Sequence, residues 1–588
     1  MTTYAIFGAG PAGLYTAYRL ATGQLENGGQ LGPGDSIELY EWGNYAFEPG
    51  DLGTRLPAGR ICSYHHEGKA EASYIEVGGM RFLQWDPGKS EGHQLVTYMI
   101  DRLKLCGDVV PFLTTEDPLF YLRGENFYQD QLTDGSVTAP YNTPGNNQKP
   151  VDVLFGNISK LMTSGSKVGD REEQCEFYAS GMLPDTTNSF VYQAGNVVGN
   201  IGYWNFFYDQ AGNEGFNYAA DAGGYSSNVI NWNAANAAIY NGEFAPGGAF
   251  KTLKSGYSQL FVELYAQAKQ AAAARGIQFV LYQSLRLHSI WSENGVPTYR
   301  LAAADAPFVP LDPKTTDNAI LAMPPNSVEL IAQATRYTDM SGKIDFLNET
   351  NVANYLESVI EQPSLKVAMF FGSEWWRDSK YPPKLVSSEG TANIFGPTIT
   401  DLPLRQIYYF GNNAPSQSGQ AVYGMLASYD DMRFTQFWRE MDLNVTERRE
   451  TPISRTYQAL AGAKAATPTM ERMLLLELAK VHYNDPDAVW QIPKPLETVV
   501  MDWGLNPFGA GYHAWKAHFD IADVMQKIRQ PAAFGGAANN VFLIGSAFSN
   551  DQAWVEGAFC TAESVLTDYL GLETIADTEK YPLICGGH

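Results

Sequence analysis

The chain has 588 residues, and one hydrophobic core rarely serves more than about 300, so we expect two or three domains. Its formal net charge of −24 argues against nucleic acid or an anionic membrane as a partner. The five cysteines are scattered, with no CxxC spacing, so neither a disulfide framework nor a zinc site is indicated.

The sequence carries no sign of membrane targeting. No run of about 18 apolar residues occurs, so no membrane span is expected. The first predicted strand starts near residue 4 and leaves no room for a signal peptide, although a trimmed mature form would look the same. We therefore expect a cytoplasmic protein, with the compartment otherwise unknown.

The first forty residues predict a strand, a glycine turn and a helix. An apolar run at residues 4–7 is followed by Gly8-x-Gly10-x-x-Gly13 and by a helix-like run at residues 14–21. Gly8 allows the turn, Gly10 lets the backbone approach a pyrophosphate, and Gly13 lets the helix lie close to the strand. The phosphates would sit on free N–H groups at the start of the helix.

A second strand, residues 36–41, ends in Glu41, which can accept hydrogen bonds from a ribose. A GxGxxG pattern alone is a weak signal, because a glycine-rich turn can serve packing only. The acid at the next strand tip argues against that alternative. We therefore predict a dinucleotide site here.

Two arginines follow this unit. A loop rich in Gly and Pro, residues 42–59, leads to Arg60, which is either a surface arginine or close enough to reach back to the phosphates. The segment 73–77 predicts a strand, and the glycine pair Gly78-Gly79 after it suggests that the backbone passes close to something flat or bulky. Arg81 projects from that turn.

The middle of the chain lacks a dinucleotide signature. Residues 94–105 have helical periodicity, and a proline-rich loop follows. Residues 191–244 are dense in aromatic side chains and predict a mostly helical cap that faces a pocket. An ordinary helical core would also account for most of these aromatics.

The next block predicts a return to the first sheet. An amphipathic helix at residues 260–274 is closed by Gly276, and strands are expected at 277–281, 285–290 and 318–323. We expect all three strands to extend the N-terminal sheet, so the dinucleotide domain is discontinuous.

A further unit, residues 326–500, contains expected strands at 364–371 and 405–410. Lys366 lies inside the first of them. A buried lysine must be paired, solvated by a trapped water or neutral, so Lys366 is a functional candidate unless it points out from an edge strand. The last expected strand, residues 540–546, leads through a turn into a helix that begins near Trp554 and ends at about residue 570.

Several motifs in this order resemble those of the flavin-containing amine oxidases, and more narrowly the L-amino acid oxidases, including bacterial oxidases of tryptophan and other aromatic amino acids. The chain departs from the family pattern where Ala58, Ser546 and Ala553 stand in place of Gly, Glu and Gly. The residues that carry the resemblance are Gly8, Gly10, Gly13, Glu41, Ala58, Gly59, Arg60, Gly78, Gly79, Met80, Arg81, Lys366, Ile407, Tyr408, Gly545, Ala553, Trp554, Val555, Glu556 and Gly557.

The resemblance implies an α/β fold: a discontinuous Rossmann-like FAD-binding domain of the glutathione-reductase type, a substrate-binding α+β domain and a helical cap. We expect the FAD-binding parts at residues 1–90, 246–325 and 501–588, the cap at 91–245, and the substrate-binding domain at 326–500. The implied FAD contacts are Gly8, Gly10, Pro11, Ala12, Gly13, Glu41, Arg60, Gly79, Met80, Arg81, Val280, Gly545, Ser546, Trp554, Val555 and Ala558.

The resemblance also implies substrate contacts. Arg81 would hold the substrate carboxylate in a bidentate pair, and Tyr408 would donate to the same group. Tyr409 points to the opposite face of the strand and should not serve. Trp554 would wall the pocket, with the Ala553 carbonyl accepting from the substrate amine, and Lys366 would hold a water near flavin N5.

The implied reaction is oxidative deamination of an L-amino acid by hydride transfer to flavin N5, with dioxygen as oxidant and a 2-oxo acid, ammonia and hydrogen peroxide as products. Ala219-Ala220 interrupt the aromatic segment, so we place Ala220 at the pocket and expect a broad range leaning to large apolar or aromatic substrates. A homodimer without bound metal is expected. Alternatives are an L-amino acid 2-monooxygenase, an oxidase of uncharged amines, and a flavin-binding or redox-sensing protein without turnover.

Overall fold

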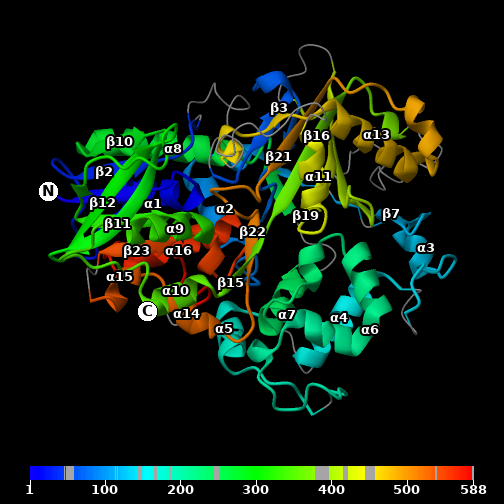
Figure 1. Cartoon of the computed structure of the whole chain (residues 1–588), viewed down its shortest axis with the longest axis horizontal. Coiled ribbons are helices and arrows are strands. Elements are labelled where there is room, and N and C mark those ends of the chain that lie inside the picture. The colour runs from blue at the N-terminus through cyan, green and yellow to red at the C-terminus, as the bar shows by residue number, and fades with distance from the viewer. Residues whose placement is uncertain are drawn as a thin grey trace.

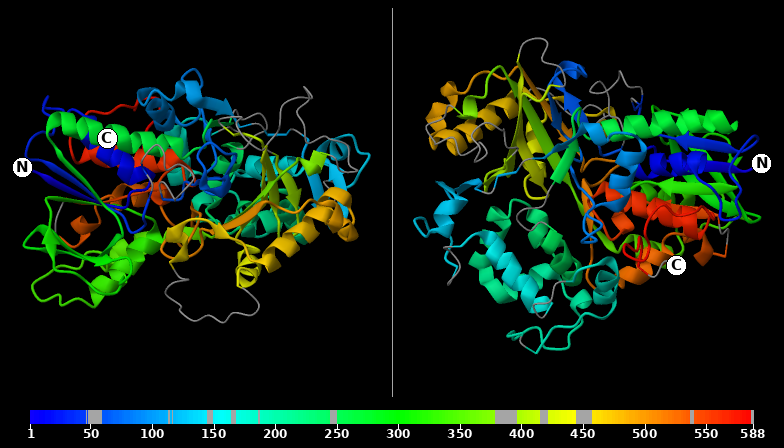
Figure 2. Two further views of the ribbon diagram at one scale, coloured as in Figure 1. Left: turned by 90° about the horizontal axis from the view of Figure 1, so that it is seen from above. Right: turned by 180° about the vertical axis from the view of Figure 1, so that it is seen from behind.

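The computed structural model describes the chain except residues 46, 48–58, 113, 116, 144–148, 164–167, 186, 244–249, 378–395, 415–420, 444–456, 537–539 and 586–588. It has mixed α/β architecture in three parts (Figure 1). A sheet flanked by helices holds both chain ends, a larger sheet stands beside it, and a helical lobe lies next to the larger sheet. The view from behind in Figure 2 shows the same division.

The first sheet is parallel and joins three distant stretches of the chain, in the order β10-β2-β1-β14-β23. Its inner strands are almost wholly buried, as parallel strands covered on both faces must be, which explains their continuous apolar runs. The strands are β1 (Thr3–Phe7), β2 (Ser36–Tyr40), β10 (Gln278–Tyr282), β14 (Asn318–Ala322) and β23 (Val541–Ile544).

Three helices pack together on this sheet: α1 (Pro11–Thr22), α8 (Gln259–Arg275) and α16 (Val555–Asp568). Proline at the first position of α1 suits a helix start, where its missing N–H costs nothing. Gly276 ends α8 in the left-handed region, with φ 71°, as its position predicts. Figure 2 shows the last helix, in red, beside the first, in blue.

One strand of the predicted block does not join this sheet. We expected residues 285–290 to extend it, and this is wrong: β11 (Leu285–Glu293) pairs antiparallel with β12 (Val296–Ala303) in a separate three-stranded sheet completed by β13 (Lys314–Thr315). An antiparallel hairpin satisfies the backbone groups of β11 locally, and α9 (Pro325–Arg336) packs against it.

The larger sheet has eight strands in the order β20-β21-β16-β19-β18-β17-β7-β8. Two of them, β7 and β8, come from the range expected as cap, so this range contributes to both parts. The strands are β20 (Lys464–Ala465), β21 (Glu497–Asp502), β16 (Ser364–Phe371), β19 (Tyr423–Asp431), β18 (Gln406–Gly411), β17 (Thr398–Thr400), β7 (Leu119–Leu122) and β8 (Glu125–Tyr128).

The two faces of β16 serve different cores. Ala368 and Phe370 join the large core shared with the first sheet, whereas Val367 and Met369 join a separate core. That second core is covered by α11 (Thr435–Met441) and α13 (Pro468–Tyr483). Because side chains alternate along a strand, Lys366 lies on the face toward the first sheet.

The helical lobe lies below the larger sheet in Figure 1. It contains α4 (Val151–Met162), α5 (Arg171–Ser180), α6 (Tyr203–Ala222) and α7 (Ala234–Glu243). The remaining elements outside short 3₁₀ turns are β3 (Ser63–His65), β4 (Tyr74–Glu76), β5 (Phe82–Leu83), α2 (Gln94–Arg102), β6 (Val109–Pro111), α3 (Gln129–Thr133), β9 (Phe250–Leu253), α10 (Thr350–Leu356), β15 (Val359–Gln362), β22 (Tyr512–Trp515), α14 (Ile521–Lys527) and α15 (Pro531–Phe534).

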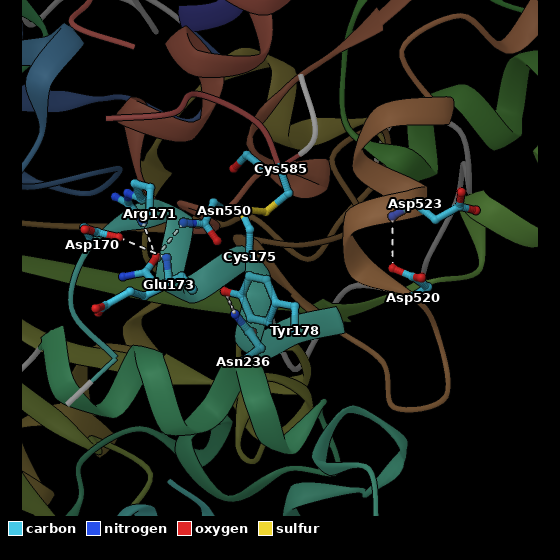
Figure 3. The surroundings of a disulfide bond; sticks show 12 residues. Asp170, Arg171, Glu173, Cys175, Tyr178, Asn236, Asp520, Asp523, Asn550 and Cys585 are labelled. Carbon is cyan, nitrogen blue, oxygen red and sulfur yellow. Dashed lines mark hydrogen bonds between the residues drawn. A yellow bond between two sulfur atoms is a disulfide. The ribbon is translucent and has the colours of Figure 1, made fainter. Parts of the chain in front are cut away.

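A disulfide ties the helical lobe to the C-terminal tail. Cys175 on α5 is bonded to Cys585, with the two Cα atoms 5.3 Å apart (Figure 3). The expectation that no disulfide is indicated is therefore wrong. The two cysteines are 410 residues apart, so only the fold brings them together. Cys62, Cys106 and Cys560 are free.

No helix in the described part of the chain is long and apolar enough to cross a membrane. Among the same residues, no group of three or more His, Cys, Asp or Glu side chains could hold a metal ion.

Candidate active site

The glycine turn after β1 is built for close approach. Gly8 has φ 112°, and a Cβ there would lie 2.3 Å from the carbonyl oxygen of Ala322. A Cβ on Gly13 would lie 1.9 Å from the Gly8 carbonyl oxygen, so α1 packs against the strand only with glycine at this position. A Cβ on Gly10, by contrast, would meet no atom nearer than the Gly59 Cα at 3.7 Å. The backbone of Gly10 is therefore accessible at the start of α1.

Glu41 follows β2 and is tied to the same turn. One carboxylate oxygen accepts from the Ala9 N–H at 2.7 Å and the other from the Gly43 N–H at 2.7 Å. Burial raises the pKa of this carboxyl group, while the two backbone donors act in the opposite direction. The carboxylate is thus held in a fixed orientation at the edge of the cavity described next.

A cavity of about 270 Å³ runs from the glycine turn to the larger sheet. Its wall includes residues from the first sheet, the segment 59–81, β16, β19, the segment 503–512 and the start of α16. The predicted site residues that line it are Gly8, Gly10, Pro11, Ala12, Glu41, Arg60, Gly79, Met80, Arg81, Lys366, Gly545, Ser546, Ala553, Trp554, Val555 and Ala558.

Four predicted site residues are absent from this lining. Gly13 packs on Gly8, and Val280 pairs with Glu38 inside the sheet. The carbonyl of Ala220 accepts a hydrogen bond from Arg405 at 2.6 Å, away from the cavity. The fourth, Tyr408, is discussed below. Ala58 lies outside the described residues.

The backbone after β4 forms part of the cavity wall and packs closely against the backbone of residues 60–62. A Cβ on Gly78 would lie 2.4 Å from the Arg60 carbonyl oxygen and 2.5 Å from the Cys62 nitrogen. The glycine pair therefore lets two backbone segments touch. The side chain of Arg60 donates to the carbonyls of Ala510 and Gly511, and burial lowers its pKa to about 10.

Arg81 is the most distinctive charge in the cavity. Its guanidinium lies 4.1 Å from the ring centroid of Phe250 and 5.1 Å from that of Phe112. In the described part of the chain it makes no hydrogen bond or ion pair. Burial lowers the pKa of Arg81, but the surrounding tyrosines, Tyr408 first among them, more than offset this and leave it raised. The cation is permanent and has no anionic partner.

Lys366 lies nearby on β16. Its Nζ donates to the carbonyl oxygens of Gly78 at 2.6 Å and Glu76 at 3.3 Å, and it lies 4.3 Å from the Tyr429 ring centroid. Burial lowers the pKa of Lys366 to about 7, although the Glu76 carboxyl group opposes that shift. Burial likewise raises the pKa of Glu76 to about 7. Two coupled groups thus titrate near neutrality beside the cavity.

Tyr408 and Tyr409 lie on opposite faces of β18, as strand alternation predicts. Tyr409 belongs to the second core and contacts His482. Tyr408 faces Arg81 but donates to Gln406 at 2.9 Å and lies behind Tyr225, with 3.3 Å between the two hydroxyl oxygens. The hydroxyl that reaches the cavity from this direction is therefore that of Tyr225.

The cavity wall also contains aromatic residues that the sequence did not single out. Tyr225 and Tyr240 belong to the aromatic-rich segment predicted to face a pocket, whereas Tyr429, Trp503 and Tyr512 were missed. Tyr225 follows Gly224, with φ 77°, just after the end of α6, and that glycine was the available signal. Tyr429 is the β-partner of Lys366 on the neighbouring strand, a pairing that no local pattern indicates.

Trp554 is the N-cap of α16, and its ring contacts His93 and Phe250 at centroid distances of 4.7 Å and 6.1 Å. Ala553, just before it, has φ 70°, a left-handed conformation that strains a residue with a Cβ. Glu556 accepts from the Leu95 and Val96 N–H groups at the start of α2 and so anchors the first turn of α16.

A parallel sheet with a glycine turn, joined through one cavity to a second sheet that supplies a buried cation, is the arrangement of the FAD-dependent amine oxidase fold. A putrescine oxidase variant with redesigned cofactor binding has this fold: its TM-score is 0.59 at 14% identity, covering 97% of this chain and 99% of that one. No family model matches the chain.

Two sequence relatives span nearly the whole length. Aplysianin-A from Aplysia kurodai is 23% identical over 578 residues, 96% of this chain and 89% of the relative. Achacin from Lissachatina fulica is 23% identical over 585 residues, which cover 96% of this chain and 92% of achacin. These comparisons confirm the resemblance that the motifs predict, to the flavin-containing amine oxidases of the L-amino acid oxidase type, and the protein is an oxidoreductase.

Proposed function

We propose that the protein oxidises L-amino acids with bound FAD and dioxygen to the 2-oxo acid, ammonia and hydrogen peroxide. The observation that carries this proposal is Arg81, a permanent, partly buried cation without an anionic partner in the described structure, on the wall of the cavity. A substrate carboxylate would supply that partner, and a planar guanidinium binds it best through two parallel hydrogen bonds.

The residues present fit FAD. The open approach to Gly10, the free N–H groups at the start of α1 and the fixed carboxylate of Glu41 suit a pyrophosphate and a ribose. We assign the parallel sheet as the Rossmann-like FAD-binding domain and the helical lobe as the cap. Bound FAD would supply the hydride acceptor for the oxidation at the substrate Cα, and its reoxidation by dioxygen would yield hydrogen peroxide.

The chain's own groups orient the substrate. Arg81 binds the carboxylate, the Tyr225 hydroxyl donates to it with Tyr408 supporting Tyr225 from behind, and the Ala553 carbonyl accepts from the amine. This fixes Cα in place, and positioning of this kind supplies much of an enzyme's rate. The positive end of α16 stabilises negative charge that develops nearby.

We nominate no strong general base, because the amine reacts in its neutral form. Lys366 holds a water beside the reacting centre, since it is buried and has donors to spare beyond its two backbone acceptors. Released imino acid then hydrolyses to the 2-oxo acid and ammonia.

Large apolar or aromatic amino acids fit the aromatic wall. Tyr225, Tyr240, Tyr429 and Trp554 line the cavity near Arg81, and ring faces stack well with such side chains. Ala220 does not contribute to substrate preference, because it does not line the cavity. The expected homodimer remains a prediction that light scattering of the purified protein would test.

The test is anaerobic bleaching of the yellow flavin by a panel of L- and D-amino acids. We expect bleaching by L-amino acids only. Arg81→Met should lower kcat/KM for amino acids about 10²–10³-fold, because it removes one partner of a buried charge pair. Arg102→Met, at an exposed arginine, is the matched control and should change nothing. A colourless protein, or bleaching of Arg81→Met by L-amino acids at the wild-type rate, would refute the proposal.

A second candidate is an oxidase of uncharged amines, which the putrescine oxidase fold favours. It would not need Arg81, so Arg81→Met would leave its rate on simple amines unchanged. L-amino acid 2-monooxygenase activity is a third outcome, and it would release carbon dioxide instead of ammonia.

A further inference from the structure

A second, much smaller cavity adjoins the large one. It has a volume of about 10 Å³, which is room for one water-sized group, and it shares Tyr240, Tyr512 and Ala553 with the large cavity. It therefore lies next to the carbonyl to which we assign the substrate amine. The rest of its wall is mostly polar: Ser227, Trp232, Asn236, Gln362, His513, Asn550 and Gln552.

The polar side chains of this wall carry an unusual number of unpaired atoms. Six of them are at least nine-tenths buried, with exposed fractions from 1% for Gln362 to 9% for Asn550. A buried polar atom without a partner costs about 1–3 kcal/mol, so such a cluster points to a ligand. In the described part of the chain the unpaired atoms are Asn236 Oδ1, Gln362 Oε1, Asn550 Oδ1, Gln552 Oε1, both ring nitrogens of His513, and Trp232 Nε1.

The orientation of two amides is set by the partners of their nitrogens. Asn550 donates through Nδ2 to the Gln174 oxygen, which also accepts from Arg171. Gln552 donates through Nε2 to a backbone carbonyl at 2.6 Å. Their free ends are therefore the oxygens. Asn236 likewise uses its nitrogen toward the Tyr178 hydroxyl, and Figure 3 shows this contact close to Asn550 and the disulfide.

The cavity is richer in acceptors than in donors. Burial, with Arg60 nearby, lowers the pKa of His513 well below its usual value, so the ring is neutral and offers one donor and one acceptor. The unpaired atoms then comprise five acceptors and two donors. Water offers two of each, whereas ammonia and ammonium offer three or four donors from a single heavy atom.

We propose that this cavity binds ammonia, or its protonated form ammonium, the nitrogen product of the proposed oxidation. The inference rests on the proposed function for the identity of the ligand. The ligand donates to the amide oxygens and lies beside Ala553, whose carbonyl we assign to the substrate amine. Ammonium that hydrolysis of the released imino acid produces enters this cavity from solution. Ammonium is therefore a product inhibitor that acts beside the position of the substrate amine.

The test measures the melting temperature of the holoenzyme in ammonium chloride against sodium, potassium and methylammonium chloride at equal ionic strength. Ammonium should raise it by about 2 °C or more beyond sodium, because a ligand of the native state stabilises by mass action. Potassium and methylammonium should match sodium, since the first donates no hydrogen bond and the second is too large.

Two variants locate the effect. Gln552→Met and Asn236→Leu keep the side-chain size and remove an acceptor, so each should abolish the ammonium-specific shift. Gln333→Met, at an exposed glutamine, should retain it. Equal shifts in all salts, a potassium shift equal to that of ammonium, or an ammonium shift that survives in both cavity variants would each overturn the proposal. Flavin bleaching is scored separately, so loss of the ammonium effect with bleaching intact refutes only this inference.

Discussion

Replacing Lys366 by Met should make the protein more stable at neutral pH. The pKa of Lys366 falls from 10.5 to about 7 on folding, and about 1.4 kcal/mol per unit makes the burial cost about 5 kcal/mol. The variant leaves the carbonyls of Glu76 and Gly78 without their donor, a penalty of about 1–3 kcal/mol. The net gain is about 2–4 kcal/mol. A lysine kept at that cost is kept for function.

The gain should depend on pH in a defined way. Between pH 7 and 10.5 the unfolded chain holds a proton on Lys366 that the folded chain has lost, so wild-type stability rises with pH across this window. The advantage of the variant is therefore full below about pH 7 and shrinks toward pH 10.5. Glu76, whose pKa is raised to about 7, titrates mostly below this window.

The assay is the midpoint of urea unfolding from pH 7.5 to 10, at a fixed excess of FAD. Lys254→Met, at an exposed lysine, is the matched control and should follow the wild type at every pH. The reasoning fails if Lys366→Met is less stable than the wild type at pH 7.5, or if its advantage does not change with pH.

Three further changes test the local geometry. Ala553→Gly should stabilise the protein by about 0.5–1 kcal/mol, because relief of the left-handed strain exceeds the added chain entropy; a lower melting temperature would contradict this. Replacing both Cys175 and Cys585 by Ser should cost about 2–5 kcal/mol, read as a lower thermal midpoint that matches the reduced wild type; no loss would mean that the disulfide does not form in solution. Glu41→Gln should weaken FAD about 10–100-fold in apoprotein titrations followed by flavin fluorescence, since an amide cannot accept at both ends; unchanged affinity would remove Glu41 from the site.

The disulfide also bears on where the protein matures. Disulfides persist in oxidising compartments and are rare in the cytosol, so the Cys175–Cys585 bond favours an oxidising compartment over the cytoplasmic location that we expected. Mass spectrometry of the protein alkylated in denaturant, without reductant, would show two of its five cysteines unmodified.

The sequence by itself determined the features that depend on neighbours in the chain. The strand, turn and helix from Thr3 to Thr22 follow from apolar runs and from glycines that must approach other backbone atoms. Gly276 ends its helix where predicted, and the alternation of strand residues separated Tyr408 from Tyr409. These outcomes rest on local sterics and on the period of the strand, which a single sequence displays.

Only the tertiary structure decided which distant segments meet. The residues of β11 predict a strand, but a strand pattern does not say which partner supplies the hydrogen bonds. Tyr225 stands in front of Tyr408 because a loop from the helical lobe passes over β18. The bond between Cys175 and Cys585 joins segments 410 residues apart that no local signal connects. Contacts between residues far apart in sequence depend on how whole elements pack, and that packing is a property of the complete fold.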